Sequence, residues 1–262
     1  MADPLHQFQI QKLVELPDVT IPGVGVIDLA ITNSHVAMTI AFAAVVLFLT
    51  VVTARPQIVP GRLQMVGETL FGMIDGVTES IIGHDGRKYF PFVFTLFMLI
   101  LGMNLLGMFL SFTATSQLAV TVTFAIMTIG LVIVVGLAKH GLGFLKLFWP
   151  TAAPLALRPV VGLIEFLSFL LRPVTLALRL FGNMLGGHVA LKIFAGFVAA
   201  LLIGALAGEG LGWWGLPVAA LSLGMVVALT ALEFLVAFLQ AFVFAVLATI
   251  YLNDVVNLGH DH

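Results

Sequence analysis

Five long runs of apolar residues with very few charges restrict what this chain can fold into. Each is long enough to cross a bilayer as a helix, which needs roughly 20 apolar residues. Of all residues, 61% are hydrophobic and 9% are charged, which excludes a soluble globular domain. The sequence therefore predicts an all-α, polytopic membrane protein with about five membrane-embedded helices. The runs cover residues 36–54, 90–112, 118–138, 160–207 and 216–252.

The last two runs are too long for one upright crossing each. We expect their helices to tilt strongly, to kink or to run partly along the membrane plane. The chain carries no sign of a separate soluble domain. Residues 1–262 are therefore treated as a single integral membrane domain, in which residues 159–252 form a tilted pair of helices.

The distribution of Lys and Arg predicts the orientation, because short cytoplasmic loops carry the excess of basic residues. The segments after the second and fourth runs contain none, and the N-terminal segment, 1–34, contains only Lys12. We expect the N-terminus outside and the C-terminus in the cytoplasm. The basic residues of the other connections are Arg55, Arg62, Arg87, Lys88, Lys139, Lys146 and Arg158.

Residues 61–82 differ from the five runs because charged and apolar residues alternate there at helical spacing. This pattern favours an amphipathic helix that lies on the cytoplasmic membrane surface. A solvated connecting helix is the alternative, and the sequence does not decide between them.

Three charged residues share one stripe of the fourth run. Glu165, Arg172 and Arg179 are spaced by seven, and seven residues turn an α-helix through about 700°, only about 20° short of two turns. Each charge costs about 2.5 to 3.5 kcal/mol at the bilayer centre, so the stripe is expected to face protein or water. For Arg179 the alternative is a structural ion pair with Glu165 or Glu233. Arg172 either snorkels to the interface or lines a water path.

Further polar residues lie on both sides of Arg179. Arg179 follows Glu165 by 14 residues, about 21 Å along a straight helix. His188 and Glu233 are plausible partners for proton exchange, since an imidazole and a carboxylate each exchange protons. His188 would lie about 180° from Arg179 on a straight helix, and a helix-packing histidine is the alternative. Gln240 follows Glu233 by seven residues on the same face of the last run, and Thr230, Ala237, Phe244 and Tyr251 extend this stripe by three- and four-residue steps. Small and polar residues in one stripe suit contact with another membrane helix, and Gln240 and Asn104 fit interhelical hydrogen bonds.

The segment Leu178-Arg179-Leu180-Phe181-Gly182-Asn183-Met184, together with Leu239-Gln240-Ala241-Phe242-Val243-Phe244, closely resembles subunit a of F-type rotary ATP synthases. The resemblance extends to Met103-Asn104-Leu105 and to the order of the helices. It implies a stator subunit that packs two tilted helices against a rotating ring of c subunits and supplies two offset aqueous half-channels. It also implies b-type peripheral stalk subunits and the rest of the synthase as partners, in a bacterial inner membrane.

The resemblance also implies roles for eight residues. Arg179 would be the essential arginine that faces the carboxylates of the ring. Glu165, Ser168 and Arg172 match positions near the cytoplasmic half-channel, whereas Asn183, His188, Glu233 and Gln240 match positions near the outer one.

One departure concerns His188 and Glu233. The best-known bacterial members place Glu at the first position and His at the second, so the pair is exchanged here, as in mitochondrial and some related bacterial members. This exchange indicates an alphaproteobacterial type of sequence, and it keeps a carboxylate and an imidazole across the same gap.

Other functions fit the sequence less well. A stand-alone secondary transporter or ion channel is the main alternative, but no inverted repeat is evident. A purely structural scaffold would not explain so many ionisable groups at membrane depth. The sequence contains no G-x-x-x-x-G-K-[ST] phosphate loop, so no catalytic chemistry of its own is expected. Nothing predicts a cofactor, a metal or a nucleic-acid partner, whereas membrane lipid is expected around the helices.

Overall fold

The computed structural model describes residues 11–15, 19–21, 25–27, 30–109, 114–141, 143–144, 157–207 and 214–258. Among these residues, five helices are long and apolar enough to cross a membrane. They are α1 (Asn33–Ala54), α3 (Phe90–Phe109), α4 (Leu118–His140), α5 (Arg158–Ala207) and α6 (Gly215–Val256). The all-α polytopic fold predicted from the apolar runs is confirmed.

The sixth α-helix, α2 (Arg62–Ile82), covers the segment predicted to be an amphipathic surface helix. Its buried residues lie on one side, namely Gly67, Ile74, Thr78 and Ile82. The amphipathic helix is therefore present, whereas its place on the membrane surface stays a prediction. Two short 3-10 helices, η2 (His84–Lys88) and η3 (Ala114–Ser116), complete the helical elements described.

The N-terminal segment contains short strands that the sequence analysis did not predict. Strand β1 (Lys12–Glu15) pairs antiparallel with β4 (Ala30–Thr32), and β2 (Val19–Ile21) pairs antiparallel with β3 (Gly25–Ile27). Residues 1–10 of the segment 1–34 lie outside the described part of the chain, as do three short stretches between its strands.

Proline and glycine mark several helix ends. Pro56, which cannot donate a backbone hydrogen bond, lies two residues after the end of α1 at Ala54. Gly83 ends α2 with a φ of 81°, and its N–H donates to the Glu79 carbonyl over 2.9 Å. Gly141 ends α4 with a φ of 55°. Positive φ values cost little only for glycine, so these two residues fix where the helices stop.

Helix α6 is the centre of the bundle. It packs on α5, α3, α2 and α4, while α5 packs on α6 and α4 and α1 packs chiefly on α3. The buried side of α6 includes Ala237, Ala241, Phe244, Ala248 and Leu252. Small residues on this side let neighbouring helix backbones approach closely, which favours packing in a membrane.

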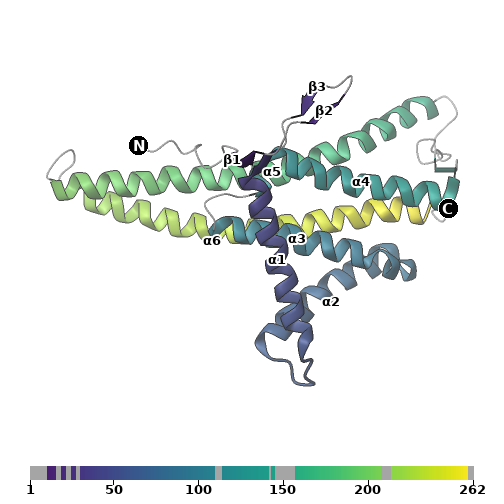
Figure 1. Cartoon of the computed structure of the whole chain (residues 1–262), viewed down its shortest axis with the longest axis horizontal. Helices are drawn as coiled ribbons and strands as arrows, with labels where there is room; N and C mark the ends of the chain where they lie inside the picture. Colours follow the sequence, from purple (N-terminus) through teal and green to yellow (C-terminus); the bar gives the residue numbers. More distant parts are fainter. Residues whose placement is uncertain are drawn as a thin grey trace.

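Helices α5 and α6 form an antiparallel pair along the long axis of the molecule, and α1 runs across them (Figure 1). Helix α5 has 50 residues and would be about 75 Å long if straight, far more than the roughly 30 Å of a hydrocarbon core. It contains Pro173 and changes direction along its length (Figure 1). Each of the two long runs therefore forms one helix that is too long to stand upright in a bilayer.

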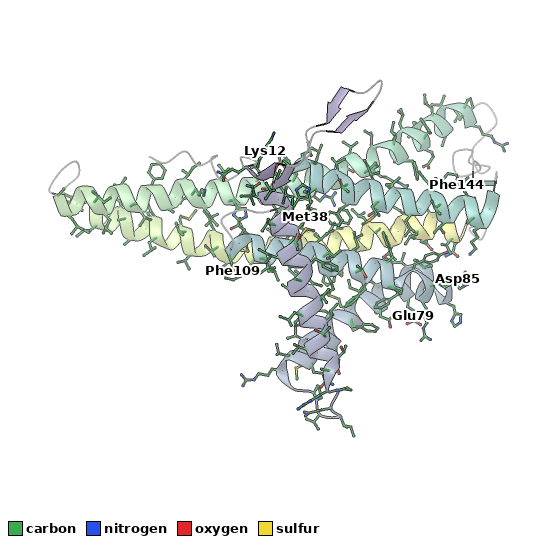
Figure 2. All side chains as sticks on the ribbon, in the orientation of Figure 1. Lys12, Met38, Glu79, Asp85, Phe109 and Phe144 are labelled. Atoms are coloured by element: carbon green, nitrogen blue, oxygen red, sulfur yellow. The ribbon has the colours of Figure 1, made fainter. Side chains whose placement is uncertain are left out.

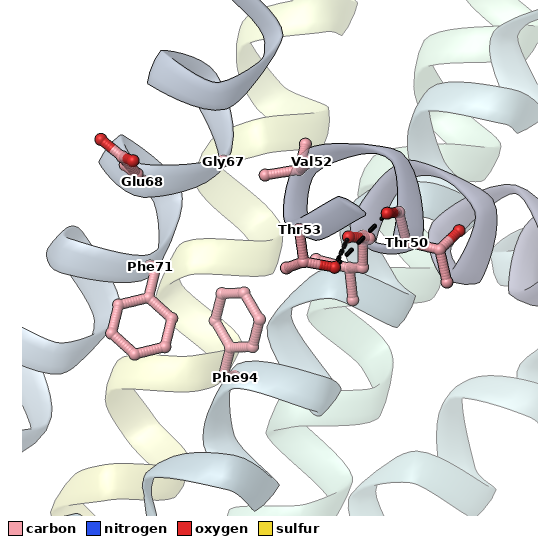
Figure 3. A pocket seen from close by; sticks show the side chains of 8 residues that line it. Thr50, Val52, Thr53, Gly67, Glu68, Phe71 and Phe94 are labelled. Carbon is pink, nitrogen blue, oxygen red and sulfur yellow. Dashed lines mark hydrogen bonds between the residues drawn. The ribbon is translucent and has the colours of Figure 1, made fainter. Parts of the chain in front are cut away.

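An apolar pocket lies where α1, α2 and α3 meet, with a volume of about 460 Å³ (Figure 3). Gly67 allows the close approach, because a Cβ there would lie 2.6 Å from Val52 Cγ1. The Thr50 and Thr53 hydroxyls donate to the Leu47 and Leu49 carbonyls of their own helix. The pocket thus offers apolar surface but few free polar groups, and the ionisable residues at membrane depth lie elsewhere.

Two glycines of α4 provide a matched test of this packing. A Cβ at Gly136 would lie 2.5 Å from Phe144 Cδ2 and 2.7 Å from Val255 Cγ1, whereas a Cβ at Gly130 would meet nothing within 4 Å. We expect Gly136→Ala to lower the free energy of unfolding by about 1 to 3 kcal/mol through overpacking. Gly130→Ala should leave it unchanged or raise it slightly, because Ala favours helix. Denaturant unfolding of the purified protein in detergent measures both, and equal stabilities would contradict the packing.

Candidate functional site

The eight residues singled out in the sequence all lie on the two long helices. Glu165, Ser168, Arg172, Arg179, Asn183 and His188 belong to α5, and Glu233 and Gln240 belong to α6. The structure brings four of them together across the α5–α6 contact. It leaves Arg179, Glu165 and Ser168 exposed on α5 and gives Arg172 a partner that the sequence analysis did not consider.

His188 and Glu233 meet inside the bundle. The imidazole Nδ1 lies 3.3 Å from the carboxylate Oε1, and the two residues are 9% and 4% exposed. Gly187 makes the contact possible, since a Cβ there would lie 2.7 Å from Glu233 Oε1. This role of Gly187 was not predicted from the sequence, although its place just before His188 was a usable signal. An imidazole and a carboxylate at this distance are placed to exchange a proton.

A second polar contact lies further along the same face of α6. The Asn183 amide Nδ2 donates to Gln240 Oε1 over 3.0 Å. Between Glu233 and Gln240, the Ala237 carbonyl accepts a hydrogen bond of 3.1 Å from Asn104 Nδ2 on α3. The predicted stripe of α6 therefore faces other helices, and Asn104 and Gln240 make the interhelical hydrogen bonds expected of them.

Several buried polar atoms of this region keep free hydrogen-bonding capacity. Gln240 Nε2, Asn104 Oδ1 and both carboxylate oxygens of Glu233 make no hydrogen bond within the described part of the chain, so the 3.3 Å contact of Glu233 Oε1 with His188 is an ion-pair distance without hydrogen-bond geometry. Buried polar atoms are normally satisfied, and unpaired ones cost free energy. Such atoms clustered between α3, α5 and α6 favour a polar path over simple packing.

Arg179 lies on the open side of α5. Its side chain is exposed, and no carboxylate of the described residues lies within ion-pair distance of it. The structural ion pair with Glu165 or Glu233 that we considered is therefore not formed. Gly182 and Gly186 follow Arg179 by three and seven residues on the exposed surface, and a Cβ at either would meet nothing within 4 Å. A partner protein can approach this small-residue surface closely.

The remaining α5 residues lie toward the N-terminal end of the helix. Arg172 Nη1 donates to Asp254 Oδ2 of α6 over 2.8 Å. Ser168, Arg172 and Thr175 contribute polar groups to an open groove of about 410 Å³ on this helix. Glu165 is exposed and meets no other predicted site residue. Sequence reasoning missed Asp254, although its position three residues after Tyr251 continues the α6 stripe.

Within the residues that the structure describes, no group of three or more His, Cys, Asp or Glu side chains is arranged to hold a metal ion. The polar groups above instead offer proton donors and acceptors. Arg179 is an exposed basic side chain of α5, with Gly182 and Gly186 beside it. A guanidinium placed in this way is open to an ion pair with a carboxylate from outside the described residues.

Comparison with known proteins gives a consistent result. Residues 35–253 match the family model described as ATP synthase A chain. "ATP synthase subunit a" of Chelativorans sp. (strain BNC1) is 49% identical over 260 residues, with 99% of each chain covered. The protein of the same name from Rhizobium etli (strain CIAT 652) is 50% identical over 258 residues, 98% of each chain. That from Hyphomonas neptunium (strain ATCC 15444) is 48% identical over 256 residues, 97% of this chain and 96% of the relative.

A double-mutant cycle tests the contact between Asn183 and Gln240. We expect Asn183→Ala and Gln240→Ala to be non-additive, with a coupling energy of about 0.6 kcal/mol, the average for interhelical hydrogen bonds in membranes. Unfolding of the purified protein in detergent measures the coupling. Thr175→Val combined with Gln240→Ala is the control, because the Thr175 hydroxyl donates to carbonyls of its own helix. Additive effects in the Asn183 cycle would show that the hydrogen bond does not form.

Proposed function

Because the chain belongs to the ATP synthase A chain family, we propose that it is the proton-conducting stator subunit of the synthase membrane sector. It is a multi-pass protein of a bacterial inner membrane. In our proposal the N-terminus lies outside, the C-terminus lies in the cytoplasm and α2 lies on the cytoplasmic surface. The α5–α6 pair faces a ring of c subunits, and b-type stalk subunits hold the chain still.

The observation that carries this proposal is the exposed Arg179 on a face of small residues. A permanent cation at membrane depth costs about 2.5 to 3.5 kcal/mol unless it meets water or an opposite charge. The described part of this chain supplies no carboxylate for it. A ring of acidic side chains moving past α5 would supply one repeatedly.

Arg179 acts on those acidic side chains through its charge. A nearby cation favours the ionised form of a carboxylate, so a protonated group that reaches Arg179 releases its proton. The same positive charge opposes the passage of a proton directly along α5. Protons that enter from one side must therefore travel around with the ring before they leave on the other side.

Two half-channels bring protons to and from the ring in this proposal. On the outer side, Glu233 and His188 exchange the proton, and Asn183 and Gln240 continue the polar path. On the cytoplasmic side, the proton leaves along the open groove lined by Ser168 and Arg172, and Glu165 lies three residues before Ser168 on the same helix. The contacts of 3.3 Å and 3.0 Å across α5 and α6 support the outer path.

Energy conversion requires partners. One proton that crosses 100 mV releases about 2.3 kcal/mol, which is too little to form a phosphoanhydride bond, so several transfers must be combined. The sequence has no nucleotide-binding phosphate loop. The chain is thus a non-catalytic subunit, and nucleotide chemistry belongs to the rest of the synthase. Co-purification with a small ring-forming proteolipid and a soluble nucleotidase tests this; proton transport by the chain alone in liposomes would contradict it.

Removal of the Arg179 charge is the most direct functional test. We expect Arg179→Ala to reduce proton-driven ATP synthesis in inverted vesicles to background while the complex still assembles, because the side chain has no ion pair among the described residues. Arg62→Ala, which removes an exposed arginine from α2, is the control and should keep activity. Normal synthesis by the Arg179 variant would exclude the proposed role.

An exchange of His188 and Glu233 tests the outer path. His188→Glu combined with Glu233→His keeps one imidazole and one carboxylate across the same gap, so we expect it to retain more proton flux than either single substitution. Fluorescence quenching of a pH-sensitive dye in vesicles measures the flux. Equal losses in all three variants would argue against proton exchange between these residues.

A further inference from the structure

Arg172 is held more firmly than a residue that merely reaches for the membrane interface. Its Nη1 lies 2.8 Å from Asp254 Oδ2, and the two side chains are only 21% and 29% exposed. The guanidinium also lies over the Tyr251 ring, 4.7 Å from its centroid, and 5.7 Å from that of Phe169. Partly desolvated ion pairs and cation–π contacts are stronger than exposed ones.

The four residues form an interhelical set with regular spacing. Phe169 and Arg172 are three residues apart on α5, and Tyr251 and Asp254 are three apart on α6. Residues at this spacing lie on the same face of a helix, so each helix presents one aromatic and one charged side chain to the other. The spacing of these residues along α5 and α6 therefore places all four side chains at the same contact between the two helices.

Other elements fasten the same end of α6. Asn257 Nδ2 donates to the Ile82 carbonyl at the end of α2 over 3.2 Å. Val255 packs at Gly136 of α4. Phe144, which follows α4, stacks edge-on against Phe169, with ring centroids 6.3 Å apart. Figure 2 shows Phe144 and Asp85 at this end of the molecule. The C-terminal end of α6 thus contacts α2, α4 and α5, and the ion pair of Arg172 with Asp254 provides the contact with α5.

The ion pair between Arg172 and Asp254 matters because Arg172 lies close to Arg179 on the same helix. The two arginines are one heptad apart on α5, about 10.5 Å along the helix. Arg172 has an anionic partner within the chain, whereas Arg179 has none among the described residues. On this stripe the two identical side chains therefore differ in whether their charge is compensated.

We propose that Arg172 and Asp254 form a clamp that fixes the C-terminal end of α6 against α5 and neutralises Arg172, so that Arg179 is the uncompensated cation of the stripe. This inference rests on the proposed function of Arg179. Arg172 and Asp254 are positioning residues: they do not touch the ring carboxylates. Without Asp254, the free guanidinium of Arg172 competes with Arg179 for the ionised ring carboxylates and loosens the contact between the helices.

Charge-balanced variants test the clamp in the assembled synthase. We expect Asp254→Asn to lower proton-driven ATP synthesis per assembled complex about tenfold, which corresponds to about 1.4 kcal/mol. Arg172→Gln should also lower it, because the carboxylate of Asp254 is then unpaired. The double variant Arg172→Gln with Asp254→Asn removes both charges together and should recover to within about threefold of the parent. Arg172→Lys, which keeps the charge, should lose less activity than Arg172→Gln.

The exposed ion pair between Asp85 and Lys139 provides the matched control. Lys139 Nζ lies 3.1 Å from Asp85 Oδ2, and the side chains are 39% and 45% exposed. The hydrogen bond from Lys139 and the charge of Lys88 hold the pKa of Asp85 below its usual value, so its carboxylate is charged at neutral pH. Exposed pairs contribute little. We therefore expect Asp85→Asn to leave synthesis unchanged.

The amount of this chain in the purified complex separates folding from coupling, because activity is expressed per assembled complex. The clamp would be overturned if Asp254→Asn had the ATP synthesis activity of the parent. It would also be overturned if the activity lost by the double variant equalled the combined losses of the two single variants. If the single variants do not assemble but the double variant does, the rescue of assembly supports it. If instead the proposed role of Arg179 were wrong, the Arg179→Ala variant would synthesise ATP normally, which is a different result from either outcome above.

Discussion

The cost of an ionisable group at membrane depth explains why the charged residues buried between the two long helices are paired. Each such group costs about 2.5 to 3.5 kcal/mol at the bilayer centre unless it is compensated. His188 therefore contacts Glu233, and Arg172 contacts Asp254, both across the α5–α6 contact. Arg179 lies seven residues after Arg172 on α5 and is exposed, without a carboxylate from the described part of the chain. The α5–α6 contact thus contains two compensated pairs, whereas Arg179 has no such partner among the described residues.

Much of the fold could be predicted from the sequence, because membrane-spanning helices follow from local composition. The predicted runs 36–54 and 118–138 correspond closely to α1 (Asn33–Ala54) and α4 (Leu118–His140), and 216–252 corresponds to α6 (Gly215–Val256). The arrangement of the helices was not predictable in this way. The central position of α6 depends on which helix faces pack against each other. The periodicity of one helix shows which face is buried but not which helix covers it. The short N-terminal strands were not predicted either, because a strand of three or four residues is too short to show the alternation of apolar and polar residues that identifies a strand.

The candidate site was predictable to a similar degree. The three- and four-residue steps of α6 correctly indicated that Glu233 and Gln240 face other helices, because this periodicity is a property of one helix. Which α5 residue meets which α6 residue depends on the register between helices. Asp254 was missed for that reason, and Gly187 was missed because its role is the space that it leaves for Glu233. The roles of these residues in proton transfer stay predictions.

The geometry also resolves a difficulty in the sequence analysis, which placed Arg179 and His188 on opposite sides of a straight α5. The structure agrees, since His188 is buried against α6 and Arg179 is exposed. Asn183 connects the two sides: it lies one turn from Arg179 on the exposed surface, yet its amide donates to the buried Gln240 over 3.0 Å. The hydrogen bond between Asn183 and Gln240 thus links a buried polar residue of α6 to the exposed surface of α5 without a break in the α5 helix.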